Sequence, residues 1–180
     1  MEIMQILKQA NKRFLFIIVP LIILFLTTSA FFILKNQLVP VKTHYHAGFV
    51  VFQNNKKLSF SDSKYMFIEP CALSQKSADS TAVIQIKKAH LHDNVGDLVH
   101  IERTGAKWQD LFTNINFTID YSSAVGYING KKIVDFQTQS IRPYDSLVIF
   151  IGKNDSKFLK QAVTKDYMIK MEKKSTTCGD

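Results

Sequence analysis

The sequence lacks the local signatures of most redox and enzyme classes. It contains two cysteines, which do not form a Cys-x-x-Cys motif, so a thioredoxin-type redox centre is excluded. It has no nucleophile elbow, no Ser-His-Asp spacing, no phosphate-binding loop and no dinucleotide fingerprint. It also has no internal repeats, no low-complexity tracts and no recognisable nucleic-acid motif. We therefore expect one modest domain with no nucleic-acid partner.

The two cysteines leave three interpretations open. In an oxidising compartment, Cys71 and Cys178 could form a disulfide that ties the C-terminal tail to the domain. Alternatively, Cys71 is a free thiol or an additional metal ligand, since Cys178 belongs to a polar terminus. The sequence does not choose among these.

The run from Phe14 to Leu34 carries no charge and is almost wholly apolar. About 20 such residues span a bilayer as a helix, so this run predicts a transmembrane anchor. A secretory signal has a shorter apolar core and ends in a small-residue cleavage site. Residues 28–30 are a weak site of that kind, but the apolar run continues beyond them. A cleaved signal and a buried soluble helix are the alternatives to the anchor.

Basic residues set the expected orientation of this span. Lys8, Lys12 and Arg13 cluster before it, whereas Lys35 and Lys42 follow it more sparsely. By the positive-inside rule, the N-terminus is cytoplasmic and the chain beyond the span is extracytoplasmic. The expected organisation is a cytoplasmic N-terminus (1–13), a transmembrane helix (14–34), a linker (35–43), an extracytoplasmic β-rich domain (44–152) and a basic C-terminal helix or tail (153–180).

The formal net charge of +8 has a local origin in the C-terminal tail, where seven lysines lie between residues 153 and 174. On an anchored protein these lysines would suit an anionic lipid or wall surface. The simpler interpretation, which we favour, is a solvated helix face. The expected partners are therefore the lipid bilayer and, as an alternative, a membrane protein complex.

The outer domain shows strand and turn patterns with two helical segments. We predict an α+β fold, with a mainly antiparallel sheet, a β-grasp-like second half, a short central helix and a C-terminal helix. Asn129-Gly130 is a strong two-residue hairpin turn. The predicted strands are 47–53, 58–60, 64–68, 81–87, 98–103, 116–120, 126–136 as a hairpin, and 146–151; the predicted helices are 105–115 and a segment beginning at 153.

All five histidines fall into three tight clusters: His44-Tyr-His46, His90-Leu-His92-Asp93 and His100-Ile-Glu102. In a strand, residues i and i+2 point to the same face, so each cluster places two candidate metal ligands side by side. The second and third clusters flank the turn 94–97, and we expect the strand at His44 to lie beside that hairpin. The alternative is that these histidines are merely polar, outward-facing strand residues.

Imidazole is the commonest metal ligand, and this donor set suits zinc or copper. The candidate ligands are His44, His46, His90, His92 and His100. Asp93 and Glu102 are further ligands or acceptors that orient an imidazole. Five histidines exceed what one tetrahedral zinc needs, and no catalytic residue can be assigned, so we favour a non-catalytic metal-binding module.

Two other functions stay open. One is a zinc-dependent hydrolase or hydratase that uses Glu102 or Asp93 as its base. The other is an accessory or structural subunit of a membrane complex.

The stretch from His44 to Ile115 resembles a poorly characterised group of prokaryotic membrane-anchored extracytoplasmic proteins. Their pattern is His-x-His, then His-x-His-Asp, a glycine turn, a histidine two residues before an acidic residue, and an aromatic helix. The matching residues are His44, His46, His90, His92, Asp93, Gly96, His100, Glu102, Trp108 and Phe112. This chain has Leu111-Phe112 where the group has an aromatic pair. The resemblance implies a bacterial or archaeal surface protein that binds metal. The thiol-disulfide isomerase label sometimes given to the group does not suit a chain without Cys-x-x-Cys.

Overall fold

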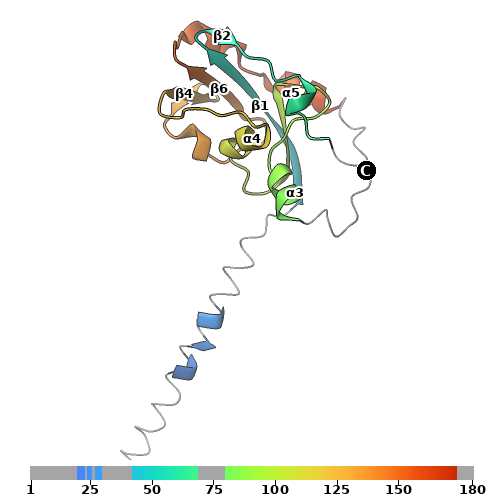
Figure 1. Cartoon of the computed structure of the whole chain (residues 1–180), viewed down its shortest axis with the longest axis vertical. Coiled ribbons are helices and arrows are strands. Elements are labelled where there is room, and N and C mark those ends of the chain that lie inside the picture. The colour runs from blue at the N-terminus through green and yellow to red at the C-terminus, as the bar shows by residue number, and fades with distance from the viewer. Residues whose placement is uncertain (1–19, 23, 26, 30–41, 69–79, 174–180) are drawn as a thin grey trace, which may run out of the picture. The chain divides into compact units, whose positions relative to one another are not determined.

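The computed structural model describes residues 20–22, 24–25, 27–29, 42–68 and 80–173 (Figure 1). The chain divides into two units, Met1–Pro40 and Val41–Asp180. In the first unit the described residues are helical. Within the described part of the chain, no helix has both the length and the apolar character that crossing a bilayer requires. The transmembrane helix over 14–34 stays a prediction, and both cysteines lie outside the described residues.

The second unit is built on a six-stranded sheet in which the long strand β1 pairs with three other strands (Figure 1). The order is β2-β1-β6-β4-β5, and β3 pairs with β1 beside this path. Strands β1 and β6 run parallel, whereas the other pairs are antiparallel, so the sheet is mixed. The strands are β1 (Lys42–Gln53), β2 (Lys56–Lys57), β3 (Leu98–Arg103), β4 (Ala124–Ile128), β5 (Lys131–Ile133) and β6 (Ser146–Ile151).

Each face of the sheet has its own apolar core. Helix α4 (Trp108–Asn114) buries Trp108, Leu111 and Phe112 in the larger core. Helix α5 (Lys165–Glu172) buries Met168 in the smaller core on the other face. Along β1, Phe49 and Val51 belong to the first core and the alternate residues Val50 and Phe52 to the second, as the period of a strand requires.

Several predictions from the sequence are confirmed. The central helix is α4, the C-terminal helix is α5, and the apolar strand 146–151 is β6, buried along nearly its whole length. Both hairpin turns carry residues with positive φ, namely Asn54 and Asn55 in one turn and Asn129 and Gly130 in the other. Asparagine and glycine tolerate this backbone region better than other residues, which explains the turn signals.

The strand predicted over 81–87 is wrong, because Thr81–Ile86 forms helix α3. Six residues that alternate apolar and polar cannot by themselves distinguish a strand from a helical turn. Ser80 caps the helix by accepting a hydrogen bond from the Val83 amide. At its other end, the Asn114 side-chain amide donates to the carbonyls of Gln85 and Ile86, an interaction that tertiary packing supplies.

Four other segments also differ from the sequence-based expectation. The strand predicted over 58–60 does not form, and β2 lies just before it at Lys56–Lys57. No strand forms over 116–120. Residues 64–68 hold part of the 3₁₀ turn η1 (Ser63–Tyr65) and a single bridge from Met66 to Leu91. The segment after residue 153 begins with the 3₁₀ helix η3 (Ser156–Gln161) before α5; another 3₁₀ turn, η2 (Phe136–Thr138), follows β5.

Candidate metal centre

The histidines share one face of the sheet because the strands alternate. The odd-numbered neighbours of the histidines, among them Ala47, Leu91, Val99 and Ile101, are buried in the larger core. The even-numbered histidines therefore point to the opposite face, the one covered by α5. The predicted i, i+2 pairing is thus what the strands produce, and the apolar neighbours anchor each pair.

Strand register brings the three clusters together. On β1 and β3, His46 lies directly opposite His100. On the other side of β3, His90 and His100 exchange both backbone hydrogen bonds, at 3.0 and 2.8 Å. His100 is consequently the middle of a row of three histidines across neighbouring strands. Its ring centroid lies 4.8 Å from that of His46 and 5.0 Å from that of His90. The expected pairing of β1 beside the returning strand is confirmed, but the first arm of the predicted hairpin is helix α3 followed by an isolated bridge at His90.

Within the part of the chain that the structure describes, two groups of three residues could hold a metal ion, and both include His100. His44, His46 and His100 form what we call the strand triad. His90, His100 and Glu102 form what we call the cavity triad. Within each triad the candidate ligand atoms lie within 4.8 Å of one another. A tetrahedral zinc with bonds of 2.0–2.1 Å needs separations of about 3.4 Å, which small side-chain rotations can reach.

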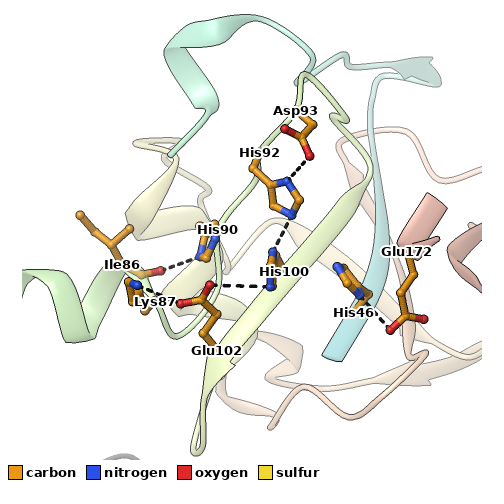
Figure 2. A network of polar contacts seen from close by, with 9 residues as sticks. All are labelled: His46, Ile86, Lys87, His90, His92, Asp93, His100, Glu102 and Glu172. Atoms are coloured by element: carbon orange, nitrogen blue, oxygen red, sulfur yellow. Dashed lines mark hydrogen bonds and ion pairs between the residues drawn. The ribbon is translucent and has the colours of Figure 1, made fainter. Parts of the chain in front are cut away.

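His100 is oriented by a chain of polar contacts that begins at Asp93 (Figure 2). The His92 Nδ1–H donates to Asp93 Oδ2 at 2.7 Å, because a carboxylate can only accept. For a neutral His92, Nε2 is then an acceptor, and it receives the Nδ1–H of His100 at 2.5 Å. His100 is left with its lone pair on Nε2, the nitrogen that makes no hydrogen bond among the described residues.

Two further histidines have Nδ1 facing an acceptor. The His90 Nδ1–H donates to the carbonyl oxygen of Ile86 at 3.2 Å. The Nδ1 atom of His46 lies 3.4 Å from Glu172 Oε1 on α5, a contact longer than an ordinary hydrogen bond (Figure 2). Metal-binding histidines usually donate their second nitrogen as His90 does here, which fixes the ring and leaves Nε2 for the ion.

Burial keeps the central imidazoles neutral, the form that binds metal. His46 is 2% exposed and His100 is 6% exposed. Burial lowers the pKa of His100 to about 2, and the nearby His90 adds to this effect by charge repulsion. Burial also lowers the pKa of His46, although the charge of Glu172 opposes the change. Both rings are therefore unprotonated at neutral pH.

Glu102 directs its two oxygens to different partners. Oε2 pairs with the ammonium of Lys87 at 3.2 Å, whereas Oε1 lies 3.8 Å from His100 Nε2. A carboxylate held by one oxygen presents the other in a defined direction, as metal-ligating carboxylates commonly do. Glu102 is therefore placed to bind an ion rather than to act only as a distant base.

A cavity of about 420 Å³ opens beside the cavity triad. All three members of that triad line it, together with His92 and Asp93, and Met66 and Phe67 form part of its apolar wall. Neither His44 nor His46 is among the lining residues. The two triads thus have different surroundings, since His44 is exposed on β1 outside this cavity.

The predicted site residues differ in their position and their role. Six of them fall on one face, as expected: His44, His46, His90, His92, His100 and Glu102. Neither triad includes His92 or Asp93, which instead orient His100. Reasoning from the sequence missed Glu172. Its carboxylate contacts both His46 and the Tyr144 hydroxyl, which donates to Oε2 at 3.1 Å. No local pattern links residues so far apart in the chain.

A scan against protein-family models, a search of curated proteins and a search of solved structures each found no match.

Proposed function

We propose that this protein binds a zinc or copper ion on an extracytoplasmic domain anchored by the apolar segment 14–34, and that it catalyses no reaction. One observation carries the metal assignment. Among three neighbouring imidazoles, Nδ1 of His90 and of His100 is held by a hydrogen bond, and Nδ1 of His46 lies 3.4 Å from the Glu172 carboxylate. This arrangement leaves Nε2 as the metal-binding atom, as in known metal sites. The imidazole and carboxylate donors suit either metal.

The membrane anchor and the orientation rest on the uncharged segment and its basic flanks. A metal ion would then be captured from the surroundings of the cell. The β-grasp-like topology belongs to the same proposal. Its support is the order β2-β1-β6-β4-β5 with a central parallel pair.

The metal proposal is tested by titrating the full-length chain, purified in mild detergent and stripped with a chelator, with Zn²⁺ and Cu²⁺. We expect stoichiometric binding of at least one of these ions. His100→Asn should weaken that binding by at least about 100-fold, since even outer-shell substitutions cost 10–100-fold. Asparagine keeps a donor near the Nδ1 position and removes the nitrogen corresponding to Nε2, so the contact with His92 can persist.

Asp135→Asn is a matched surface control. Asp135 lies between β5 and η2, is exposed and has a positive φ that asparagine accepts. Its substitution should leave metal binding unchanged. The metal proposal is wrong if the wild-type chain binds neither ion, or if His100→Asn binds as tightly as the wild-type chain.

The orientation is tested separately by fusing alkaline phosphatase after residue 43 of the chain. We expect an active fusion, since this enzyme needs the oxidising extracytoplasmic compartment to form its disulfides. A fusion that is inactive while its polypeptide accumulates would contradict the proposed orientation.

The cavity favours a second candidate, a zinc hydrolase or hydratase. A catalytic zinc keeps an open position for water, and the cavity triad borders a space that could hold a substrate. Because Glu102 is placed as a ligand, Asp93 acting through His92 would be the base. Zinc-loaded protein that hydrolyses 4-nitrophenyl acetate, and loses this activity in Asp93→Asn while keeping zinc, would support the enzyme. No turnover by the zinc-loaded chain would favour the binding module.

A further inference from the structure

The two triads compete for one atom. The Nδ1 nitrogen of His100 is engaged by His92, so Nε2 is its only lone pair. The ring of His100 is 6% exposed, and Nε2 has no hydrogen-bond partner among the described residues. His44, His46 and His90 all lie around it, with ring centroids 4.7, 4.8 and 5.0 Å from that of His100. An ion that takes Nε2 in one triad therefore excludes an ion in the other.

The cavity is suited to admit a cation. Its charged lining groups include Asp93 and Glu102, and no lysine or arginine lines it within the described ranges. Lys87, which pairs with Glu102 Oε2, does not line the cavity, so the charged side chains among its lining residues are acidic although the formal net charge of the chain is +8. Carboxylates in a concave, partly apolar space raise the local concentration of cations and their rate of association. The cavity triad is thus the first metal position that a cation entering the cavity meets.

The strand triad is accessible to solvent at a different place. Its members His46 and His100 are buried, whereas His44 is exposed at the beginning of β1. Neither His44 nor His46 touches the cavity. The strand triad therefore borders the cavity only through the shared His100, and its exposed side toward solvent is at His44.

From this geometry we propose that the cluster is a two-position relay for one divalent cation, which enters at the cavity triad and moves to the strand triad around the shared His100. The proposal rests on the proposed metal-binding function and deepens it. It assigns the cavity as the route of loading and the exposed His44 as the side from which the ion is passed on.

The transfer is a ligand exchange that needs no oxidant and no proton donor. The bonds from the ion to His90 Nε2 and Glu102 Oε1 break, bonds to His44 and His46 form, and the bond to His100 Nε2 is kept. Because the Nδ1–H of His90 donates to Ile86, a neutral His90 ring offers Nε2 to the ion. The freed carboxylate of Glu102 keeps its ion pair with Lys87 at 3.2 Å.

The test separates the rate of loading from the affinity at equilibrium. Cu²⁺ is mixed with the full-length chain, and quenching of the intrinsic fluorescence is followed by stopped flow. Glu102→Gln should slow association by about tenfold, because it removes one of the two cavity carboxylates and one ligand of the first position. Its equilibrium affinity, measured by competition with a chelator, should change much less, since the strand triad is intact.

His44→Ala should show the opposite behaviour. This exposed residue belongs only to the strand triad, so its loss should weaken equilibrium binding by about tenfold or more while the initial association rate stays unchanged. Electron paramagnetic resonance of bound Cu²⁺ should show a histidine-rich site in Glu102→Gln and a site with mixed nitrogen and oxygen ligands in His44→Ala. Asp135→Asn, at the β5 edge of the sheet, controls for the loss of one negative charge and should match the wild type.

Some outcomes overturn the relay but leave the metal-binding function standing. One is two Cu²⁺ ions bound together at the cluster of the wild-type chain. Another is a wild-type rate in Glu102→Gln, and a third is identical Cu²⁺ spectra in the two variants. Failure of the wild-type chain to bind Cu²⁺ or Zn²⁺ overturns the metal-binding function and the relay together.

Discussion

The two halves of β1 bury their side chains in different ways. The second half, from Gly48 to Gln53, pairs with β6 and fills both cores with apolar side chains. The first half, from Lys42 to Ala47, pairs with β3 and places His44 and His46 on one face. The second half is stabilised by apolar contacts. In the first half, among the described residues, both ring nitrogens of His46 lack a hydrogen-bond partner, and so does Nε2 of His100 opposite it on β3. Each such unsatisfied polar group costs about 1–3 kcal/mol of folding free energy. The second half of β1 therefore stabilises the fold, whereas the first half is organised to bind a ligand.

The largest effect is expected in the stabilising half. Phe150 on β6 is fully buried and stacks against Phe52 of β1, with ring centroids 5.4 Å apart. Phe150→Ala should lower the free energy of unfolding by about 3–5 kcal/mol, because it removes apolar contacts and leaves a cavity. Urea denaturation followed by circular dichroism measures the change. Metal stoichiometry of the folded variant should be unchanged; lost stoichiometry in a still folded variant would contradict the separation of the two halves.

The histidine-bearing half should become stabilising only when metal is present. Free Zn²⁺ or Cu²⁺ at 100 times its dissociation constant should raise the free energy of unfolding by about 2.7 kcal/mol, since the ion binds the folded state. Thermal unfolding with and without the ion measures this gain. His100→Asn should lose most of it and Asp135→Asn should keep it. An equal gain in both variants would place the ion elsewhere.

Lowering the pH should destabilise the metal-free chain through its buried histidines. The pKa of His100 is about 2 in the folded state and about 6.5 when unfolded, so between these values the unfolded chain binds one more proton. Stability contributed by the neutral ring is therefore present above pH 6.5 and falls as the pH drops below it, by about 1.4 kcal/mol per pH unit. His46 should add in the same direction.

Denaturation in the presence of a chelator from pH 7.5 to pH 5 measures this slope. His100→Asn should flatten it. The same slope in wild type and variant would show that His100 is not the group responsible.

The smallest effect is expected at the outer end of the contact chain. Asp93 is about half exposed and has a positive φ that asparagine tolerates, so Asp93→Asn should leave the stability of the metal-free chain nearly unchanged. Metal affinity should fall by about tenfold, because His92 loses the carboxylate that fixes its tautomer and through it the ring of His100. Isothermal titration calorimetry measures the affinity. A larger loss than in His100→Asn would make Asp93 a direct ligand.

Local pattern predicted the parts of the fold that depend on neighbouring residues. The two hairpin turns, helix α4 and the buried strand β6 each follow from turn residues or periodicity within a few positions. The segment 81–87 was predicted wrongly, because its alternation fits a strand, while the Ser80 cap and the Asn114 side chain stabilise a helix. The parallel pairing of β1 with β6 joins strands about a hundred residues apart, which no local pattern encodes.

The sequence by itself determined which residues could form the metal site and that each pair shares a face, because the period of a strand is two residues. Only the tertiary structure decided their roles. Strand register placed His100 between His46 and His90. The segment before β3 positioned His92 to contact the Nδ1 of His100, and α5 brought Glu172 to His46. These contacts join residues distant in the chain. Folding therefore turns two histidine pairs and one His-x-Glu pair into two overlapping triads that share one buried nitrogen.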